Sequence, residues 1–281
     1  MSIVFSEFLQ AVTGGLSWVG QQILFQVPIE QNYFWMVTAA TAIIMVLEQC
    51  FPWRKKQRFF RKDWGVDLFY LYANLFIFAA VLEPVYNVLS YLLPNSLHAP
   101  ILSEWSWGWQ LVAFFIAQDF LQWGMHRLLH ANNWLWKFHQ IHHSVKEMGV
   151  ASHFRYHWME NIFYKPTKLA ALALFAGVEP QMAVLVHMGS LLIGHLNHAN
   201  LNLDWGPLRY IFNSPTMHLL HHSQSHLAQG GVNFGISLSF WDYVFGTAVQ
   251  PTRNGELVLG FEGDADVPSN ILKQLHYPAE I

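Results

Sequence analysis

The chain has 281 residues, of which 53% are hydrophobic, 16% aromatic and only 12% charged. Soluble domains carry about 25% charged residues, so this composition favours an integral membrane protein over a soluble enzyme. The net charge of −3 with neutral histidines gives no support for nucleic-acid binding, and the single cysteine, Cys50, excludes a disulfide within the chain and a cysteine-ligated iron–sulfur or zinc-ribbon site.

The first apolar segment runs from Tyr33 to Leu47, and extending it to Phe51 approaches the roughly 20 residues that span a bilayer. The densest cationic run of the protein follows it, at Arg54, Lys55, Lys56, Arg58, Arg61 and Lys62. By the positive-inside rule this run lies in the cytoplasm.

Three further apolar segments follow. One runs from about Val66 to Leu93 and is interrupted at Glu83-Pro84, where proline can kink a helix or mark its end. Another, Trp107 to Met125, returns the chain to the cytoplasm. The last, Leu169 to Gly194, is broken around residues 177–180, and we interpret it as a shallow or tilted hairpin rather than as two full spans.

These segments predict an all-α protein, an integral membrane helical bundle with a cytosolic, histidine-rich helical cap. We divide it into N-terminal membrane helices with a basic loop (1–104), a catalytic domain (105–250) and a polar C-terminal tail on the surface (251–281). Counting spans from the basic loop makes the protein multi-pass and places the histidine clusters on the cytoplasmic face.

Those clusters are the most informative feature of the sequence. Their members are spaced by three or four residues and therefore share one face of a helix, as paired histidines do in zinc proteases. The first cluster is His126 and His130, the second is His139, His142 and His143, and the third is His218, His221 and His222.

Eight imidazoles exceed what one tetrahedral or octahedral ion needs, so two metal ions are the economical interpretation. Imidazole suits zinc, copper, iron or nickel, and ligand type alone does not choose among them. His195 and His198, at the end of an apolar helix, are candidate additions to the ligand set. His153 and His187 are more typical of packing or solvated positions.

Three other residues are candidates around the metal. Asp119 lies two helical turns before His126, and a buried carboxylate there could orient metal-bound imidazoles. Glu160 could do the same. His157 could be a ligand, an orienting group or a residue that faces the substrate, and we group it with Asp119 and Glu160 as catalytic candidates.

This pattern resembles the fatty acid hydroxylase/sterol desaturase superfamily over about residues 105–250. Trp158 departs from it by standing where that family usually has proline, and Gly231 by standing where an aspartate often lies. The matching segments are 119–130, 136–144, 154–160, 198–201, 215–223 and 233–247.

The resemblance implies a membrane enzyme with two iron ions that uses O₂ to hydroxylate or desaturate a lipid-like substrate, such as a fatty acyl chain, a sterol or a carotenoid. Zinc could occupy the same site by misloading. Because the chain has no dinucleotide fingerprint and no iron–sulfur cysteines, electrons are expected from a separate ferredoxin, cytochrome or reductase.

Three other classes compete with this interpretation. A metal transporter should place its ligands near the bilayer midplane, whereas these clusters fall at span ends. A zinc membrane hydrolase should carry a motif such as His-Glu-x-x-His, which is absent from the sequence. A haem protein needs only one or two axial histidines per haem, and this chain has too many clustered histidines for that class.

Overall fold

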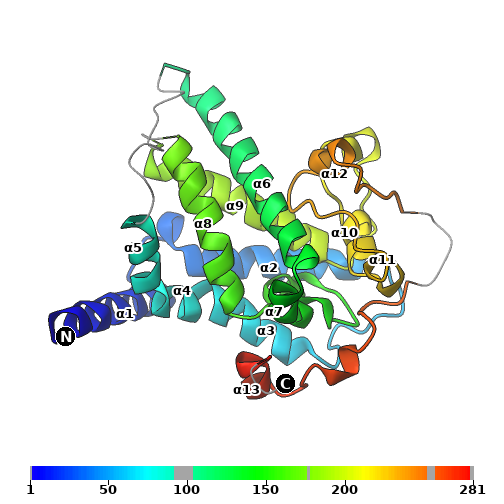
Figure 1. Ribbon diagram of the computed structural model, residues 1–281, viewed down its shortest axis with the longest axis horizontal. Coiled ribbons are helices and arrows are strands. Elements are labelled where there is room, and N and C mark those ends of the chain that lie inside the picture. Colours follow the sequence, from blue (N-terminus) through cyan, green and yellow to red (C-terminus); the bar gives the residue numbers. More distant parts are fainter. Residues whose placement is uncertain (1, 92–103, 176–177, 252–256, 279–281) are drawn as a thin grey trace.

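The computed structural model of the protein describes residues 2–91, 104–175, 178–251 and 257–278, and these fold almost entirely as helices (Figure 1). In the described residues, β structure is limited to three isolated bridges, of which Pro52–Leu201 and Ser223–Leu259 join distant parts of the chain. The predicted all-α class is therefore confirmed.

The helices of the N-terminal part are mostly apolar. The chain segment Trp64–Val81 is continuous, because a π-helical turn at Ala73–Ile77 links α3 to α4. The bounds are α1 Ser2–Ile23, α2 Tyr33–Cys50, α3 Trp64–Tyr72, α4 Phe78–Val81 and α5 Glu83–Tyr91.

The helices of the C-terminal part carry the histidines. They are α6 Trp107–Ala131, α7 Asn133–His143, α8 Met159–Leu174, α9 Pro180–His198, α10 Pro215–His221, α11 Gln224–Leu227, α12 Phe240–Val244 and α13 Ile271–His276, with a short 3₁₀ helix, η4, at Val150–Phe154. Figure 1 shows the long helix α6 running beside α8, with α7 at its lower end.

Among the described residues, two helical segments are long and apolar enough to cross a membrane by length and composition, Tyr33–Cys50 and Trp64–Val81. The predicted interruption at Glu83-Pro84 is a helix end, since α4 stops at Val81 and α5 starts at Glu83. The predicted segments at Trp107 and at Leu169 to Gly194 are also helical, but they do not pass the same test among the described residues.

The core that supports the histidine helices lies where α6, α8 and α9 meet. Phe114 of α6 packs against Ala171 of α8 and Met182 of α9, all of them buried. A second cluster joins α2 and α3 to α9 through Val37, Leu71 and Leu191. Burial of these apolar side chains fixes α9 between the two halves of the chain.

The tail after Pro251 differs from its predicted position on the surface. Leu259, Phe261 and Tyr277 are buried, and the Tyr277 hydroxyl donates to Oε1 of Gln140 on α7 at 2.7 Å. The polar composition of the tail hides these few apolar anchors, which return the chain to the outer side of the histidine helices.

A single asparagine makes the turn between α6 and α7. Its side-chain Oδ1 accepts hydrogen bonds from the backbone N–H groups of Trp134 at 3.0 Å and Leu135 at 3.1 Å, as an N-cap does. Asn132 therefore ends one histidine helix and starts the next, so that the two helices pack against each other.

Replacing this cap should weaken the fold. Asn132→Ala leaves two N–H groups of α7 without their acceptor, and we expect a loss of about 1 kcal/mol, a fall in Tm of about 2 °C. Thermal unfolding in detergent measures it. The neighbouring Asn133→Ala is the control, because Asn133 is exposed and makes no side-chain hydrogen bond to a described residue. Equal Tm values for the two variants would contradict the assigned cap.

Candidate metal centre

Nine of the ten histidines predicted to bind metal come together as two groups of ring nitrogens. In each group, one nitrogen from every member lies within 4.8 Å of those of the others. The first histidine group is His126, His130, His139, His143 and His221, and the second histidine group is His142, His198, His218 and His222.

The two His-x-x-His-His motifs divide between the groups in opposite ways. On α7, His139 and His143 join the first group and His142 joins the second. At α10, His218 and His222 join the second group and His221 joins the first. Residues four apart share a face, while the residue between them points to the side, so the two helices face each other and each contributes to both groups.

The second group is tightly convergent. Nε2 of His198 lies 3.1 Å from Nε2 of His142 and 3.0 Å from Nε2 of His218. The groups are neighbours, because the rings of His143 and His222 stack with centroids 4.3 Å apart. Several imidazole nitrogens directed at one point form the donor set that a transition metal takes.

Backbone carbonyls fix the orientation of several rings. A carbonyl only accepts hydrogen bonds, so in each case Nδ1–H donates and leaves Nε2 with its lone pair. The pairs are His126 to Phe234 O at 2.7 Å, His221 to Val232 O at 2.8 Å, His198 to Gly194 O at 2.8 Å and His142 to Arg155 O at 3.3 Å. This is the arrangement by which proteins hold histidine ligands for a metal.

The opposite nitrogens test whether a metal fits. Nε2 of His139, His143 and His221 is buried and has no hydrogen-bond partner among the described residues. Leaving such a group unsatisfied costs about 1–3 kcal/mol. A metal ion bound by these lone pairs removes that cost, so the residues present fit a metal ion.

Electrostatics agree with the geometry. Burial, helped by neighbouring histidines, lowers the pKa of His143 and His222 well below the usual value. Burial likewise lowers the pKa of His198 to about 3. The rings are therefore neutral at physiological pH, which is the form that binds metal.

Glu160 lies beside the first histidine group, as the sequence predicts. Its Oε2 accepts from Nδ1 of His139 at 2.9 Å, and its Oε1 has no hydrogen-bond partner among the described residues. Burial raises the pKa of its carboxyl well above the usual range, and in the described chain no lysine or arginine forms an ion pair with it. A metal cation behind His139 would favour its ionised form.

Asp119 has a different position from the one predicted. It is fully buried and forms no hydrogen bond with a histidine in the described structure. Its carboxylate accepts from Ser237 N at 3.0 Å, Leu238 N at 3.2 Å and Trp241 Nε1 at 3.0 Å. A spacing of two helical turns places Asp119 on the His126 side of α6. Its hydrogen-bond capacity is used there by the segment 237–241, not by a histidine. Asp119 therefore anchors that segment.

Asp242 acts one step from a ligand. Its carboxylate accepts from Phe234 N at 2.9 Å, Gly235 N at 2.8 Å and Trp123 Nε1 at 3.1 Å. The carbonyl of the same Phe234 orients His126. Burial raises the pKa of Asp242, and these donors oppose the rise.

His157 lies outside both groups. Its Nδ1 accepts from Met159 N at 3.1 Å, so Nε2–H donates to Leu275 O at 3.0 Å. Trp158 Nε1 donates to the same carbonyl at 2.9 Å. Both side chains hold the C-terminal tail, and neither faces the histidine groups.

His195 is the one predicted ligand that the structure places elsewhere. Thr41 donates its hydroxyl proton to Val37 O, so Nε2–H of His195 donates to Thr41 Oγ1 at 3.3 Å. Its Nδ1 lies 2.6 Å from Nδ1 of His153 and accepts from it. With both nitrogens engaged, His195 offers none to a metal.

His153, which the sequence left as a packing residue, stacks on His198 with ring centroids 4.7 Å apart. The absence of a side chain at Gly194 allows this, since a Cβ there would lie 2.5 Å from the His153 ring. The sequence signal was weak, because His153 belongs to no helical histidine pattern.

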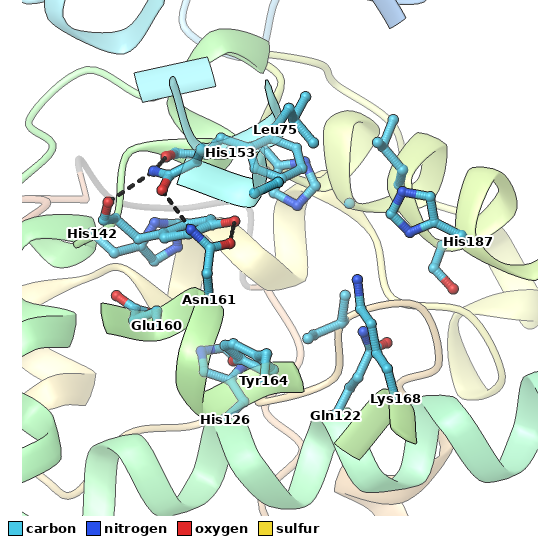
Figure 2. Close-up of a pocket in the computed structure, with 18 of the residues that line it drawn as sticks. Leu75, Gln122, His126, His142, His153, Glu160, Asn161, Tyr164, Lys168 and His187 are labelled. Atoms are coloured by element: carbon cyan, nitrogen blue, oxygen red, sulfur yellow. Dashed lines mark hydrogen bonds between the residues drawn. The ribbon is translucent and has the colours of Figure 1, made fainter. Parts of the chain in front are cut away.

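A cavity of about 310 Å³ adjoins both groups, which is the size of a small-molecule site. Figure 2 shows His142 and Glu160 on one side of it and Lys168 and His187 on the other. The histidines that line it are His126 and His139 of the first group and His142, His198 and His218 of the second, together with His153 and His187.

Comparisons with known proteins agree with the site. Residues 111–247 match the family model described as fatty acid hydroxylase, and this range contains every member of both histidine groups. No solved structure matches the chain significantly.

Several relatives act on lipids according to their names. Ornithine lipid hydroxylase OlsE from Rhizobium tropici is 32% identical over 202 residues, covering 71% of this chain and 57% of the relative. Alkylglycerol monooxygenase from Homo sapiens is 29% identical over 178 residues, which cover 62% of this chain and 38% of the relative. Sphingolipid C4-hydroxylase sur2 from Schizosaccharomyces pombe is 32% identical over 142 residues, which cover 50% of this chain and 47% of the relative. The matched part of the chain thus spans between 38% and 57% of the length of these relatives.

The second group predicts how metal content responds to mutation. His142→Ala leaves it three ligands, so we expect the metal content of iron-loaded protein to fall by about one ion per chain. Elemental analysis measures it. His226→Ala is the matched control, since His226 follows His222 closely but bonds to Ser223 outside both groups. Full metal content in His142→Ala would remove it from the ligand set.

The carboxylate of Glu160 predicts a second effect. Glu160→Gln keeps the shape but removes the charge that supports His139, and we expect metal affinity to fall about 10-fold or more. Competition with a chelator measures the affinity. Glu147→Gln, an exposed change on the loop after α7, should leave it unchanged. An unchanged affinity in Glu160→Gln would leave Glu160 with a packing role only.

Proposed function

We propose that this chain, whose residues 111–247 match the fatty acid hydroxylase family model, is a membrane-bound di-iron oxygenase that hydroxylates or desaturates a lipid with O₂. The observation that carries the proposal is the pair of convergent histidine groups, which border one cavity. The named activities of the relatives support a lipid substrate.

The two groups supply the places for two metal ions. The first has five candidate ligands and the second has four, and imidazole donors are compatible with iron. Bound there, two iron ions would supply O₂ activation and the oxidising power to break an unactivated C–H bond. Zinc could occupy the same donors as a misloaded metal.

The chain's own residues prepare this chemistry. The carbonyls of Phe234 and Val232 hold His126 and His221 in place, and Glu160 supports His139. The histidines of both groups that line the cavity are themselves buried. Apolar side chains such as Leu75, Leu191 and Ile236 line its walls, where the hydrocarbon part of a lipid can lie.

Membrane embedding and orientation are part of the proposal. Tyr33–Cys50 and Trp64–Val81 are the candidate spans. The predicted multi-pass arrangement adds residues 107–125 of α6 and the hairpin over residues 169–194. The basic loop between α2 and α3 lies near the second group, because the Arg54 N–H donates to Oδ1 of Asn200 at 2.8 Å, two residues after His198. This proximity supports a cytoplasmic position for the histidines.

Electrons are expected from a separate protein. The single cysteine of this chain cannot hold an iron–sulfur cluster. A ferredoxin, a cytochrome or a reductase on the cytoplasmic side is the partner that the proposal requires.

Isotope incorporation tests the function. Iron-loaded protein in lipid nanodiscs, with a chemical or ferredoxin electron supply, should transfer an atom of ¹⁸O from ¹⁸O₂ into a lipid, or introduce a double bond, and mass spectrometry detects either product. His142→Ala should lose the activity while His226→Ala retains it. Turnover that is independent of O₂ would contradict an oxygenase and favour a hydrolase.

A further inference from the structure

Two lysines of α8 line the cavity away from the histidine groups. Lys165 and Lys168 share the wall with Tyr33 and His187, whose Oη and Nε2 atoms lie 2.8 Å apart. In Figure 2 the Lys168 side chain extends into the cavity beside Gln122, opposite His142. Ammonium groups are unusual in the wall of a site that has to receive hydrocarbon.

Among the described residues, no carboxylate forms an ion pair with the Lys168 ammonium. In the described part of the chain it forms no hydrogen bond and no ion pair, and the Lys165 ammonium lies over the ring of Tyr86 at 4.2 Å. Glu83 of α5 attracts the Lys165 ammonium electrostatically, but it is exposed and forms no ion pair with it in the described structure. Burial and the neighbouring Lys165 lower the pKa of Lys168 to about 8, so Lys168 is mainly charged at neutral pH. Burial also lowers the pKa of Lys165, and Glu83 opposes this shift.

We infer that the substrate carries an anionic group, a carboxylate or a phosphate, that binds at Lys165 and Lys168 while its chain extends to the histidine groups. This inference rests on the proposed function, because it identifies the lysines as the part of the oxygenase site that recognises the substrate. An anion there neutralises two half-buried positive charges that otherwise repel each other.

Helix α8 fixes the distance between the two ends of such a substrate. Glu160, Asn161, Tyr164, Lys165 and Lys168 all line the cavity, and their spacing makes one continuous stripe along the helix. Glu160 bonds to His139, and a rise of 1.5 Å per residue puts Lys168 roughly 12 Å further along. The anionic group and the reacting carbon are therefore separated by a rigid spacer.

Lys168→Met tests the inference, because methionine keeps the length and removes the charge. The probes are laurate, dodecyl phosphate and dodecanol, which share one chain length and differ in the headgroup. Binding is measured by competition against radiolabelled laurate, on iron-loaded protein in a non-ionic detergent. Lys168→Arg keeps the charge, and Lys56→Met, an exposed change outside the cavity, is the matched control.

Wild-type protein should bind at least one of the two anions about 10-fold more tightly than dodecanol, the effect of one hydrogen bond to a charged group. Lys168→Met should lose that preference and keep its affinity for dodecanol, while Lys168→Arg and Lys56→Met should retain the preference. Tighter binding of laurate than of dodecyl phosphate identifies a carboxylate substrate, and the reverse identifies a phosphate.

Equal affinities of wild-type protein for dodecanol and both anions would overturn the inference. So would an unchanged anion preference in both Lys168→Met and Lys165→Met, or an equal loss for anions and alcohol, which indicates a structural role. The proposed function can fail independently of this inference. Lysine-dependent anion binding without ¹⁸O incorporation or double-bond formation would contradict the oxygenase and leave the anion site standing. If the protein oxidises a neutral lipid, shows no preference for anions and is unaffected by Lys168→Met, the oxygenase stands and only the inference is contradicted.

Discussion

The structure depends on holding nine imidazoles, eight of them buried and His130 half-buried, with their nitrogens directed at two points. A buried polar nitrogen is costly unless something satisfies it, and each ring has two. The fold satisfies Nδ1 of His126, His142, His198 and His221 with backbone carbonyls and that of His139 with Glu160. The opposite nitrogens are left for metal. The backbone carbonyls that accept these hydrogen bonds must therefore be held in fixed positions around the helices. Several buried polar side chains outside the histidine groups hold them there.

The segment after α11 shows how this is achieved. Asp242 fixes the N–H groups of Phe234 and Gly235, and Asp119 fixes those of Ser237 and Leu238. Asn233 adopts a positive φ of 52°, which asparagine tolerates better than most residues. Two buried carboxylates on different helices thus determine where the Phe234 carbonyl lies, and with it the ring of His126. Neither carboxylate needs to touch a metal to control its geometry.

The helical class, the break near residue 180 and the grouping of nine of the ten candidate histidines could be predicted from the sequence. They follow from apolar runs and from spacings along one helix. The division of His142 and His221 between groups could not, since it depends on how α7 and α10 face each other. The same limit explains His195 and Asp119: each has the right spacing, but a tertiary neighbour, His153 or the 237–241 segment, engages it first. The lysines of α8 did leave a signal, because Lys165 and Lys168 continue the stripe of Glu160.

Placing the supporting carboxylate and the lysines on one helix has a mechanistic consequence. Selectivity for one carbon of a flexible chain needs two fixed points, since a site that holds only hydrocarbon lets the chain slide. In the proposed complex, α8 provides both, with Glu160 behind His139 at one end and Lys168 at the other. The helix is packed into the core through Ala171 against α6 and α9, so the spacing is rigid. The position of oxidation is then set by the distance along the helix, and a substrate with a longer or shorter reach would present a different carbon to the metal centre.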